Sequence, residues 1–342
     1  MNFVRAIVIV GVVAFSGHAY AQAKIDWQVT VYADGGHNAF TDLIRWKDAY
    51  YICFRQGEHH LSMDGVIRVM RSDDMQTWEP CGTIRTHGDD RDPHFAATDD
   101  RLFVFFGVWD LQFGAGTALP DRGKVRSHAA FTEDGETWSK VSGLFEPAWW
   151  LWRVRHHDGV FYSLAYTAVR PPPSARETLL LQSADGLKWD RVSRVTNERM
   201  CGEADMRFND DGSMWIISRT GDEAGDAARF DSDPTRMKWT RRDMGTLIHA
   251  PAIANWHDRL FVAGRGRTDG EYNTQLWEID DAAVAPLITL PSGGDTSYPG
   301  LLTDPDADPN GPPTFFITWY SQHETKDRYE SNIYAARVTV EP

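Results

Sequence analysis

The chain has 342 residues, of which 42% are hydrophobic and 25% charged, and its formal net charge is −14. This composition excludes disordered, collagen-like and coiled-coil chains and predicts a packed core. The acidic balance offers no general attraction to nucleic acid or to an anionic membrane, so any bound anion must meet a local cluster of arginines. Three cysteines without a Cys-x-x-Cys pair argue against a disulfide framework and a cysteine zinc site.

Residues 1–21 have the pattern of a cleaved secretory signal. Arg5 precedes an apolar run from Ala6 to Phe15, and Ala19-Tyr20-Ala21 follows as a cleavage site. The apolar run is too short to span a bilayer comfortably. We therefore expect a periplasmic or secreted monomer without membrane insertion, in which residues 22–342 form one domain.

The rest of the chain repeats one unit about six times. Each unit is a pair of β-favouring runs joined by a turn rich in Asp, Gly, Asn or Lys, which is typical of a β-hairpin. The units are Leu43–Phe54, Phe95–Phe106, Val154–Tyr166, Met206–Arg219, Ile253–Arg265 and Leu301–Tyr320. Their first strands begin near residues 38, 92, 153, 203, 250 and 297, which is the period of a repeat fold.

A second element follows several of these hairpins. It reads S/T-x-D-x-x-x-W and occurs as Ser72–Trp78, Thr132–Trp138 and Ser183–Trp189, with a degenerate copy that ends at Trp239. The hydroxyl and carboxylate can bond the backbone of a tight turn, while Trp buries a large surface beneath the hairpin. The motif therefore indicates how the chain folds, and it does not indicate a reaction.

These segments resemble the Asp boxes of the sialidase and BNR-repeat superfamily, whose members are β-propellers with a site at the central axis. The resemblance implies an all-β propeller of six four-stranded blades, with five blades as the main alternative. Ile25–Tyr32 and Asn332–Val340 both alternate like strands. Pairing them in one blade would close the ring and leave no free edge.

Three hairpins end their second strand with arginine, namely Arg55, Arg219 and Arg265. Corresponding positions of different blades meet at the axis, so these arginines could together bind one carboxylate through charge-assisted hydrogen bonds. The alternative is that each arginine pairs separately with a structural Asp or Glu.

Two strand starts supply further candidates by resemblance to sialidases. Glu203 opens the fourth unit and Tyr298 the sixth, and the resemblance makes Tyr298 the nucleophile and Glu203 its base. A 2-keto sugar acid carries a carboxylate on its anomeric carbon that would repel an anionic nucleophile, whereas a phenol approaches neutral. The alternatives are core packing for Tyr298 and a salt bridge alone for Glu203.

Asp92 is the first choice for the acid that protonates the leaving group, because burial beside a sugar would raise its pKa. Asp42 is the second choice. The sequence departs from the family where His37-Asn38-Ala39-Phe40 replaces the Arg-Ile-Pro-like opening that usually supplies the first clamp arginine. Arg55 is proposed in its place.

Several histidines fall at or near strand ends on the same side, and His37, His94 and His249 are candidates for contacts with substrate. Trp150 could stack on a sugar ring or pack between blades. No compact ligand spacing indicates a metal, so neither a metal nor a cofactor is expected.

The leading interpretation is a secreted glycoside hydrolase that resembles exo-sialidases and removes a terminal acidic sugar from a glycan with retention. A polysaccharide lyase for uronic-acid glycans is the alternative enzyme, because His, Tyr and a neutralising Arg are the groups used in β-elimination. A non-catalytic carbohydrate-binding propeller is the third interpretation, since Asp boxes serve folding.

Overall fold

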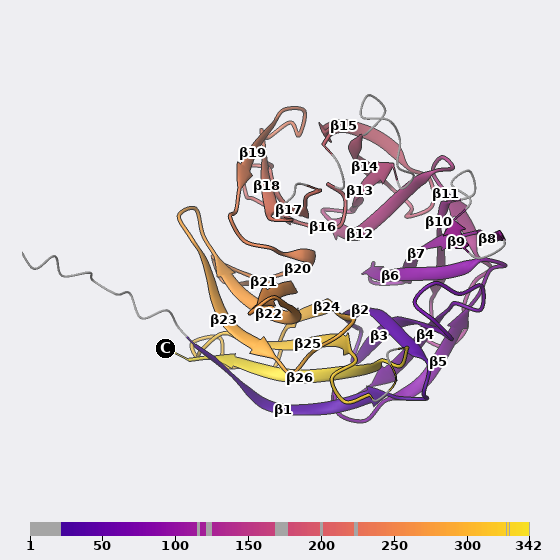
Figure 1. Cartoon of the computed structure of the whole chain (residues 1–342). Helices are drawn as coiled ribbons and strands as arrows, with labels where there is room; N and C mark the ends of the chain where they lie inside the picture. The colour runs from indigo at the N-terminus through magenta and orange to yellow at the C-terminus, as the bar shows by residue number, and fades with distance from the viewer. Residues whose placement is uncertain are drawn as a thin grey trace, which may run out of the picture.

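The computed structural model describes residues 22–341 apart from 115–116, 121–124, 168–176, 199–200, 222–224, 326 and 328. The predicted signal, residues 1–21, lies outside this range. The described residues form strands and turns, with six four-stranded antiparallel sheets around a central axis and one further two-stranded ribbon (Figure 1). The predicted six-bladed all-β propeller is confirmed. No helix of the described part is long and apolar enough to cross a membrane.

Each blade has four strands, which follow one another from the axis outward. Blade 1 comprises β2 (His37–Trp46), β3 (Ala49–Gly57), β4 (Val66–Ser72) and β5 (Glu79–Ile84). Blade 2 comprises β6 (Asp89–Ala97), β7 (Leu102–Trp109), β10 (Arg126–Thr132) and β11 (Ser142–Leu144), and the ribbon of β8 (Leu111–Gly114) and β9 (Thr117–Pro120) lies between β7 and β10 in sequence. Blade 3 comprises β12 (Trp149–His157), β13 (Val160–Thr167), β14 (Thr178–Ser183) and β15 (Asp190–Thr196). Blade 4 comprises β16 (Ala204–Phe208), β17 (Met214–Arg219), β18 (Ala227–Ser232) and β19 (Trp239–Asp243). Blade 5 comprises β20 (His249–Trp256), β21 (Arg259–Thr268), β22 (Glu271–Ile279) and β23 (Val284–Leu290). Blade 6 comprises β24 (Thr296–Thr303), β25 (Thr314–Ser321), β26 (Asn332–Val340) and β1 (Ala23–Tyr32).

The two ends of the described chain close the ring in blade 6. Strand β1 pairs with β26 from Ala23 opposite Val340 to Tyr32 opposite Ile333. Figure 1 shows this indigo and yellow pair along one side of the propeller. The predicted pairing is confirmed, and it supplies hydrogen-bond partners to strands that would otherwise be open edges.

The three S/T-x-D segments form the turns between the third and fourth strands of blades 1, 2 and 3. In the blade 3 copy, Ser183 Oγ accepts a hydrogen bond from Gly186 N at 2.9 Å, and Asp185 Oδ1 accepts two more from Leu187 N and Lys188 N at 2.8 Å. Gly186 has a φ of +76°, the left-handed conformation that glycine adopts at low cost. These turns lie in the outer half of the blades and contribute no group to the axis.

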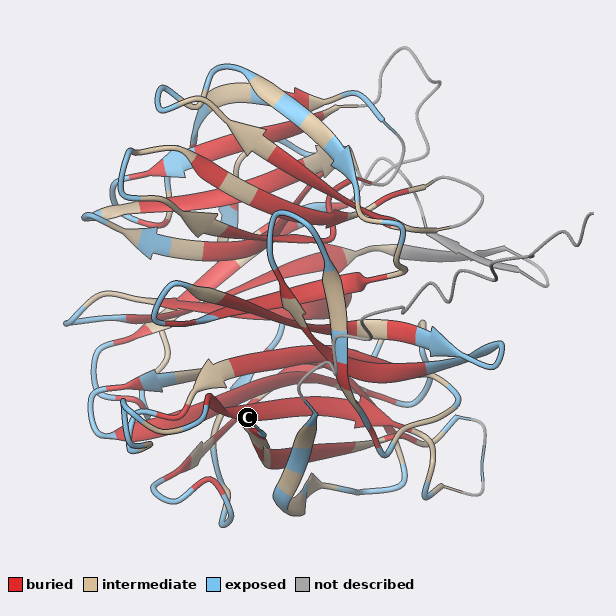
Figure 2. Ribbon diagram, turned by 90° about the vertical axis from the view of Figure 1, so that its left-hand side faces the viewer, coloured by how far each residue is buried: buried red, intermediate tan, exposed pale blue. Residues whose placement is uncertain are grey.

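The core is divided by blade. Six clusters of buried apolar side chains each join two neighbouring blades, and a seventh gathers side chains of several blades, such as Phe40, Trp152 and Tyr298. Figure 2 shows the buried residues along the strands and the exposed ones mainly at the turns and outer strands. Because apolar burial is the main favourable term in folding, each blade depends on both neighbours.

A β-bulge near the start of most inner strands directs side chains toward the axis. Strands β2, β6, β12, β20 and β24 each carry one extra residue relative to the next strand. Four bulge residues have a positive φ, namely Phe40 (62°), Asp92 (51°), Ala250 (46°) and Tyr298 (47°). Non-glycine residues rarely adopt this conformation, and bulges with such strain are enriched beside functional sites.

The second bulge residue of blade 3, Arg153, is buried where inner strands of blades 1, 3, 5 and 6 meet. Arg153 Nε donates to Pro251 O at 2.9 Å, Nη1 donates to Asp42 Oδ1 at 2.5 Å, and Nη2 donates to Pro299 O. The guanidinium therefore ties the bulges of blades 5 and 6 to blade 1. Asp42 also accepts from Phe95 N, so this second-choice acid has a structural role.

Candidate active site

A tyrosine and a glutamate from two different blades meet at the axis. Tyr298 Oη lies 3.1 Å from both carboxylate oxygens of Glu203, although the residues are 95 positions apart. Glu203 directly precedes β16, and Tyr298 sits on the bulge of β24 with its carbonyl accepting a hydrogen bond from Thr41 Oγ1 at 3.0 Å. The structure thus brings together the two residues predicted as base and nucleophile.

Two of the predicted arginines flank this pair. Arg219 Nη1 donates to Glu203 Oε1 at 2.8 Å, and the backbone N–H of Arg219 donates to the Glu203 carbonyl, so their spacing follows from pairing across one hairpin. Arg265, opposite His249 in blade 5, places its guanidinium carbon 4.8 Å from the centre of the Tyr298 ring. Arg219 Nε is buried and has no hydrogen-bond partner among the described residues, while the Arg219 side chain as a whole is 22% exposed.

The charges around the pair set opposite protonation states. Burial and the Glu203 carboxylate raise the pKa of Tyr298 above its ordinary value, against the opposing effect of Arg265 and Arg219. Burial alone would raise the pKa of Glu203, but Arg219, together with His249 and Arg265, more than compensates and holds that pKa below its ordinary value. A neutral phenol therefore faces an ionised carboxylate, the arrangement that a base-assisted phenol nucleophile requires.

Asp92 lies at the same level on the bulge of β6 and is 7% exposed. Arg91 Nε donates to Asp92 Oδ2 at 3.4 Å, and its guanidinium stacks on Phe40 and Trp109. Burial raises the pKa of Asp92 to about 6, while Arg91 opposes the shift. Asp92 is thus a carboxyl that can carry a proton in mildly acidic solution.

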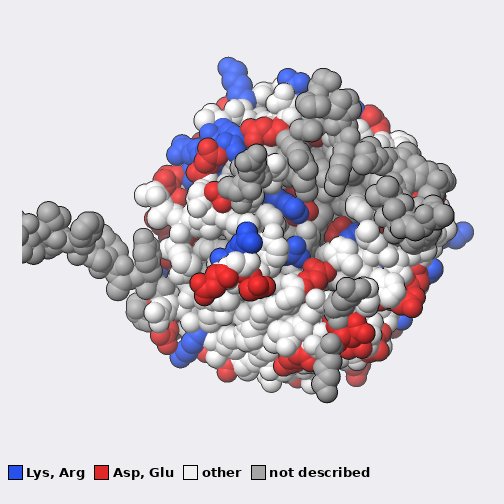
Figure 3. Space-filling view, in the orientation of Figure 1, with Lys and Arg blue, Asp and Glu red and all other residues white. Residues whose placement is uncertain are grey.

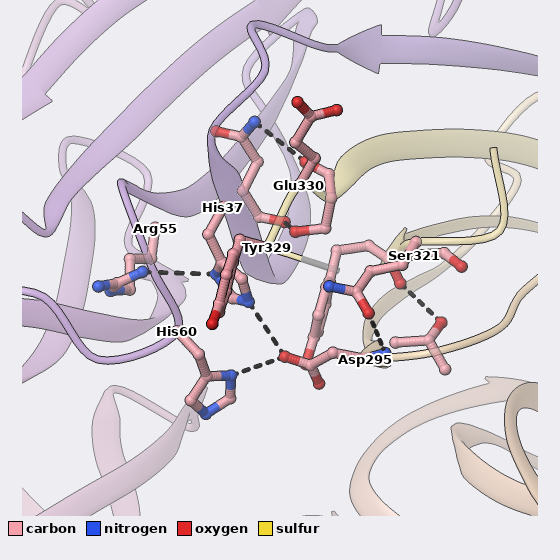
Figure 4. A network of polar contacts seen from close by, with 12 residues as sticks. His37, Arg55, His60, Asp295, Ser321, Tyr329 and Glu330 are labelled. Atoms are coloured by element: carbon pink, nitrogen blue, oxygen red, sulfur yellow. Dashed lines mark hydrogen bonds and ion pairs between the residues drawn. The ribbon is translucent and has the colours of Figure 1, made fainter. Parts of the chain in front are cut away.

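Asp295 organises a second set of groups beside the pair (Figure 4). Its Oδ2 accepts from His37 Nε2 at 3.0 Å and from His60 Nδ1 at 2.6 Å, and its Oδ1 accepts from Arg265 Nη2 at 3.1 Å and Tyr320 Oη at 2.7 Å. Burial opposes ionisation of Asp295, yet the histidine hydrogen bonds outweigh it and hold the pKa of Asp295 far below its ordinary value. This carboxylate fixes the position of Arg265 as well as of both histidines.

The predicted role of Arg55 in the clamp needs correction. Arg55 is fully buried, and its Nε donates to Asp89 Oδ1 of blade 2 at 2.7 Å. Its nearest group in the site is His37, whose Nδ1 lies 3.5 Å from Arg55 Nη1. Arg55 therefore forms a separate structural ion pair with Asp89, which was the alternative interpretation, and it contacts His37 on the buried side of the ring instead of facing a ligand.

Two further candidates are also displaced from the site. His94 is 4% exposed and packs against Trp152 at a ring separation of 5.0 Å, with Asp42 3.9 Å from its Nδ1. Trp150 is 1% exposed and packs edge-on to Trp109, and a Cβ at Gly107 would lie 2.1 Å from its ring. Trp150 thus fills the space between blades 2 and 3, where a sugar cannot reach it.

His249 and His37 do lie beside the charged groups. His249 Nε2 lies 3.2 Å from the Gly225 carbonyl, and burial together with Arg219 lowers the pKa of His249 to about 4. Burial also lowers the pKa of His37, in spite of its bond to Asp295. Both rings are therefore neutral hydrogen-bonding groups at neutral pH.

Sequence reasoning missed several members of the site. Tyr166 approaches Glu203, Tyr298 and Asp92 closely enough for their charges to influence its pKa, which burial raises well above the ordinary value. Asp295 and Arg91 are adjacent or close in sequence to predicted residues, but the repeat pattern assigned them no role. One usable signal was the proline that follows Asp92, Ala250 and Tyr298, because proline inside a strand marks a bulge.

Among the described residues, His37, His60 and Asp295 hold three ligand atoms within 4.8 Å of one another, a spacing that a metal could use. However, Arg55 approaches His37 Nδ1 as a donor, which leaves the proton of this neutral ring on Nε2. A ligating histidine normally donates from its second nitrogen, and Arg55 prevents that here. The geometry therefore favours a hydrogen-bond network over a metal site.

Figure 3 shows basic and acidic side chains gathered around a hollow near the centre of the face that carries these residues. The face presents arginine donors, one ionised carboxylate beside a phenol, and one carboxyl of raised pKa. Such a set can bind an acidic group, deprotonate a nucleophile and donate a proton.

No family model and no curated protein matches the sequence. Solved structures do resemble it. A protein of unknown function from Dyadobacter fermentans has a TM-score of 0.76 at 18% identity, covering 94% of this chain and 100% of that one. Trypanosoma rangeli sialidase has a TM-score of 0.67 at 12% identity, and the endosialidase of phage phi92 has 0.64 at 11%. The matches cover 89% and 93% of this chain, but only 55% and 70% of those two proteins. The fold is therefore that of sialidase-like six-bladed propellers.

Proposed function

We propose that this protein is a retaining glycoside hydrolase that removes a terminal acidic sugar from a glycan, with Tyr298 as nucleophile and Glu203 as its base. The observation that carries the proposal is the 3.1 Å contact of the Tyr298 hydroxyl with both Glu203 oxygens, beside Arg219 and Arg265. Similarity to sialidase structures is in keeping with it.

The chemistry follows from charge. The carboxylate of a 2-keto sugar acid is bound by Arg219 and Arg265, and it disfavours attack by an anionic side chain. Tyr298 attacks the anomeric carbon as Glu203 takes the phenol proton, which forms a glycosyl-tyrosine. Water then cleaves this intermediate with overall retention. Asp92 is the carboxyl of raised pKa at this level and is the first candidate for donating a proton to the leaving group.

The test is release of a reducing 2-keto acid from aryl and alkyl α-glycosides of N-acetylneuraminic acid and related 2-keto acids, with the first anomer identified by NMR. Glu203→Gln and Tyr298→Phe should each lower kcat at least a hundredfold. Tyr50→Phe, which changes a buried tyrosine between blades 1 and 6, is the matched control and should keep full activity. Turnover by Tyr298→Phe at the wild-type rate would exclude the nucleophile assignment.

A uronate lyase is the second candidate, because the imidazole of His60 is half-exposed beside these groups. A lyase would leave an unsaturated uronate, which is detected by its ultraviolet absorbance, whereas binding without turnover would indicate a carbohydrate-binding propeller. We also propose export of the protein through residues 1–21, which detection of a processed N-terminus at Gln22 would test.

A further inference from the structure

His60 and Asp295 form a dyad that the proposed function does not use. His60 lies in the turn after β3, and Asp295 directly precedes β24, 235 positions later. Their Nδ1 and Oδ2 atoms are 2.6 Å apart. The other ring nitrogen, Nε2, has no hydrogen-bond partner among the described residues, and Figure 4 shows it directed away from Asp295.

The network determines which nitrogen of His60 carries the proton. The Asp295 carboxylate also accepts hydrogen bonds from Arg265, Tyr320 and His37, so it is an ionised acceptor. His60 Nδ1 must then be the donor in the 2.6 Å contact, which leaves Nε2 as the atom that gains or loses a proton. A carboxylate that orients a histidine and stabilises its charged form is the arrangement of an acid–base dyad.

The position of His60 suits an outgoing group. The rings of His60 and Tyr298 both pack edge-on against Phe40, at 5.6 and 5.2 Å between centroids, so His60 lies one ring away from the nucleophile. Its side chain is 49% exposed, whereas the side chain of Asp92 is 9% exposed. A leaving group must depart toward solvent, and His60 stands on that side of the pair.

We infer that His60, positioned by Asp295, protonates the leaving group in the proposed hydrolysis, in place of Asp92. The inference rests on the proposed function. As Tyr298 Oη bonds to the anomeric carbon, the glycosidic C–O bond breaks and the proton of His60 Nε2 passes to the leaving oxygen. In the second step, neutral His60 takes a proton from the attacking water, and the bond between the anomeric carbon and Tyr298 Oη breaks as Glu203 returns its proton to the departing phenolate. Asp295 remains ionised throughout.

Four charged or titratable groups surround His60. Asp295 contacts the His60 ring directly, and His37 bonds to the same Asp295 carboxylate. Arg91 Nη1 donates to the His60 carbonyl at 3.3 Å. Asp92 lies close enough for the charge of His60 to influence its pKa. No hydrogen bond joins the side chains of His60 and Asp92, both of which the structure describes, and each can be replaced separately by mutation.

The experiment compares two glycosides of N-acetylneuraminic acid, a 4-nitrophenyl glycoside whose phenolate departs without protonation and an alkyl glycoside that needs a proton. His60→Ala should lower kcat/KM for the alkyl glycoside by about a hundredfold or more and for the aryl glycoside by less than about tenfold. Azide, which attacks the intermediate without a base, should restore turnover of the aryl glycoside. Asp295→Asn should show the same pattern in weaker form.

His59→Ala is the matched control, because His59 neighbours His60 but packs on Tyr329 and makes no contact with Asp295. It should leave both substrates unaffected, and Asp92→Asn should lower both rates alike. Equal losses for both substrates in His60→Ala, or leaving-group dependence in Asp92→Asn instead, would overturn the inference while leaving the proposed function intact. An inactive wild type on every 2-keto acid glycoside would refute the proposed function and the inference with it.

Discussion

Replacement of Asp92 by Asn should stabilise the protein in a way that depends on pH. Burial raises the pKa of Asp92 to about 6 from an ordinary 3.8. The folded protein therefore holds this proton more tightly than the unfolded chain does, and the wild type loses stability as pH rises through this interval. Asn keeps the shape, cannot ionise and tolerates the left-handed φ of 51° at this position.

The magnitude follows from the difference between the two pKa values. At 1.36 kcal/mol per pKa unit, a change from 3.8 to about 6 corresponds to roughly 3 kcal/mol. The free energy of unfolding of Asp92→Asn relative to wild type should thus increase by about 3 kcal/mol between pH 3.5 and pH 8. The attraction of Arg91 for the ionised carboxylate is already contained in the pKa of about 6, so it needs no separate allowance.

Urea denaturation of both proteins at several pH values measures this difference directly, because the titrations of all other groups largely cancel between them. The difference in unfolding free energy between Asp92→Asn and the wild type should rise mainly between pH 3.8 and about pH 6, and it should be constant above pH 7. A stability difference that does not change with pH, or one that falls as pH rises, would refute the argument that Asp92 is buried at a desolvated position.

Three further predictions concern the two arginines beside Glu203 and Tyr298, the buried pair of Arg153 and Asp42, and the interface between blades 2 and 3. Arg219→Lys should raise KM for an acidic glycoside about tenfold or more, because the single ammonium of lysine cannot bond Glu203 and a substrate carboxylate at once as the planar guanidinium of arginine can. Steady-state kinetics measures this change. Arg153→Met should lower the free energy of unfolding by about 3–5 kcal/mol in urea titrations, because it leaves Asp42 buried without its cation. Gly107→Ala should cost about 1–3 kcal/mol in the same assay, because its Cβ would lie 2.1 Å from Trp150; unchanged stability would contradict the packing described.

Several features of the site could be read from local pattern. Glu203 and Arg219 face each other because they close one hairpin, and a hairpin register follows from its turn. Tyr298 reaches Glu203 because both open inner strands, and every inner strand starts at the same end of the axis. Their matching positions in two repeats were therefore enough to predict that Glu203 and Tyr298 lie close together.

Other features depended on what a neighbouring blade supplies. Arg55 occupies the same strand position as Arg219 and Arg265, yet Asp89 of the next blade draws its guanidinium away from the site. Likewise, the space beside Gly107 in blade 2 determines that Trp150 packs between blades. Neither partner is recognisable from the repeat pattern, because the repeats are degenerate at these positions.

The sequence by itself predicted a repeat fold of about six hairpin units, the pairing of its terminal strands and the end of the axis at which polar side chains gather, because alternation, turn chemistry and repeat period are local properties of the chain; the choice of six blades over five came with the structure. Only the tertiary structure decided which arginines face that end, that Asp295 joins His37, His60 and Arg265, and that Asp92 is buried. Those outcomes depend on contacts between blades, over separations from 30 residues for Arg265 and Asp295 to 258 for His37 and Asp295, and a bulge of one residue changes the direction in which a side chain points.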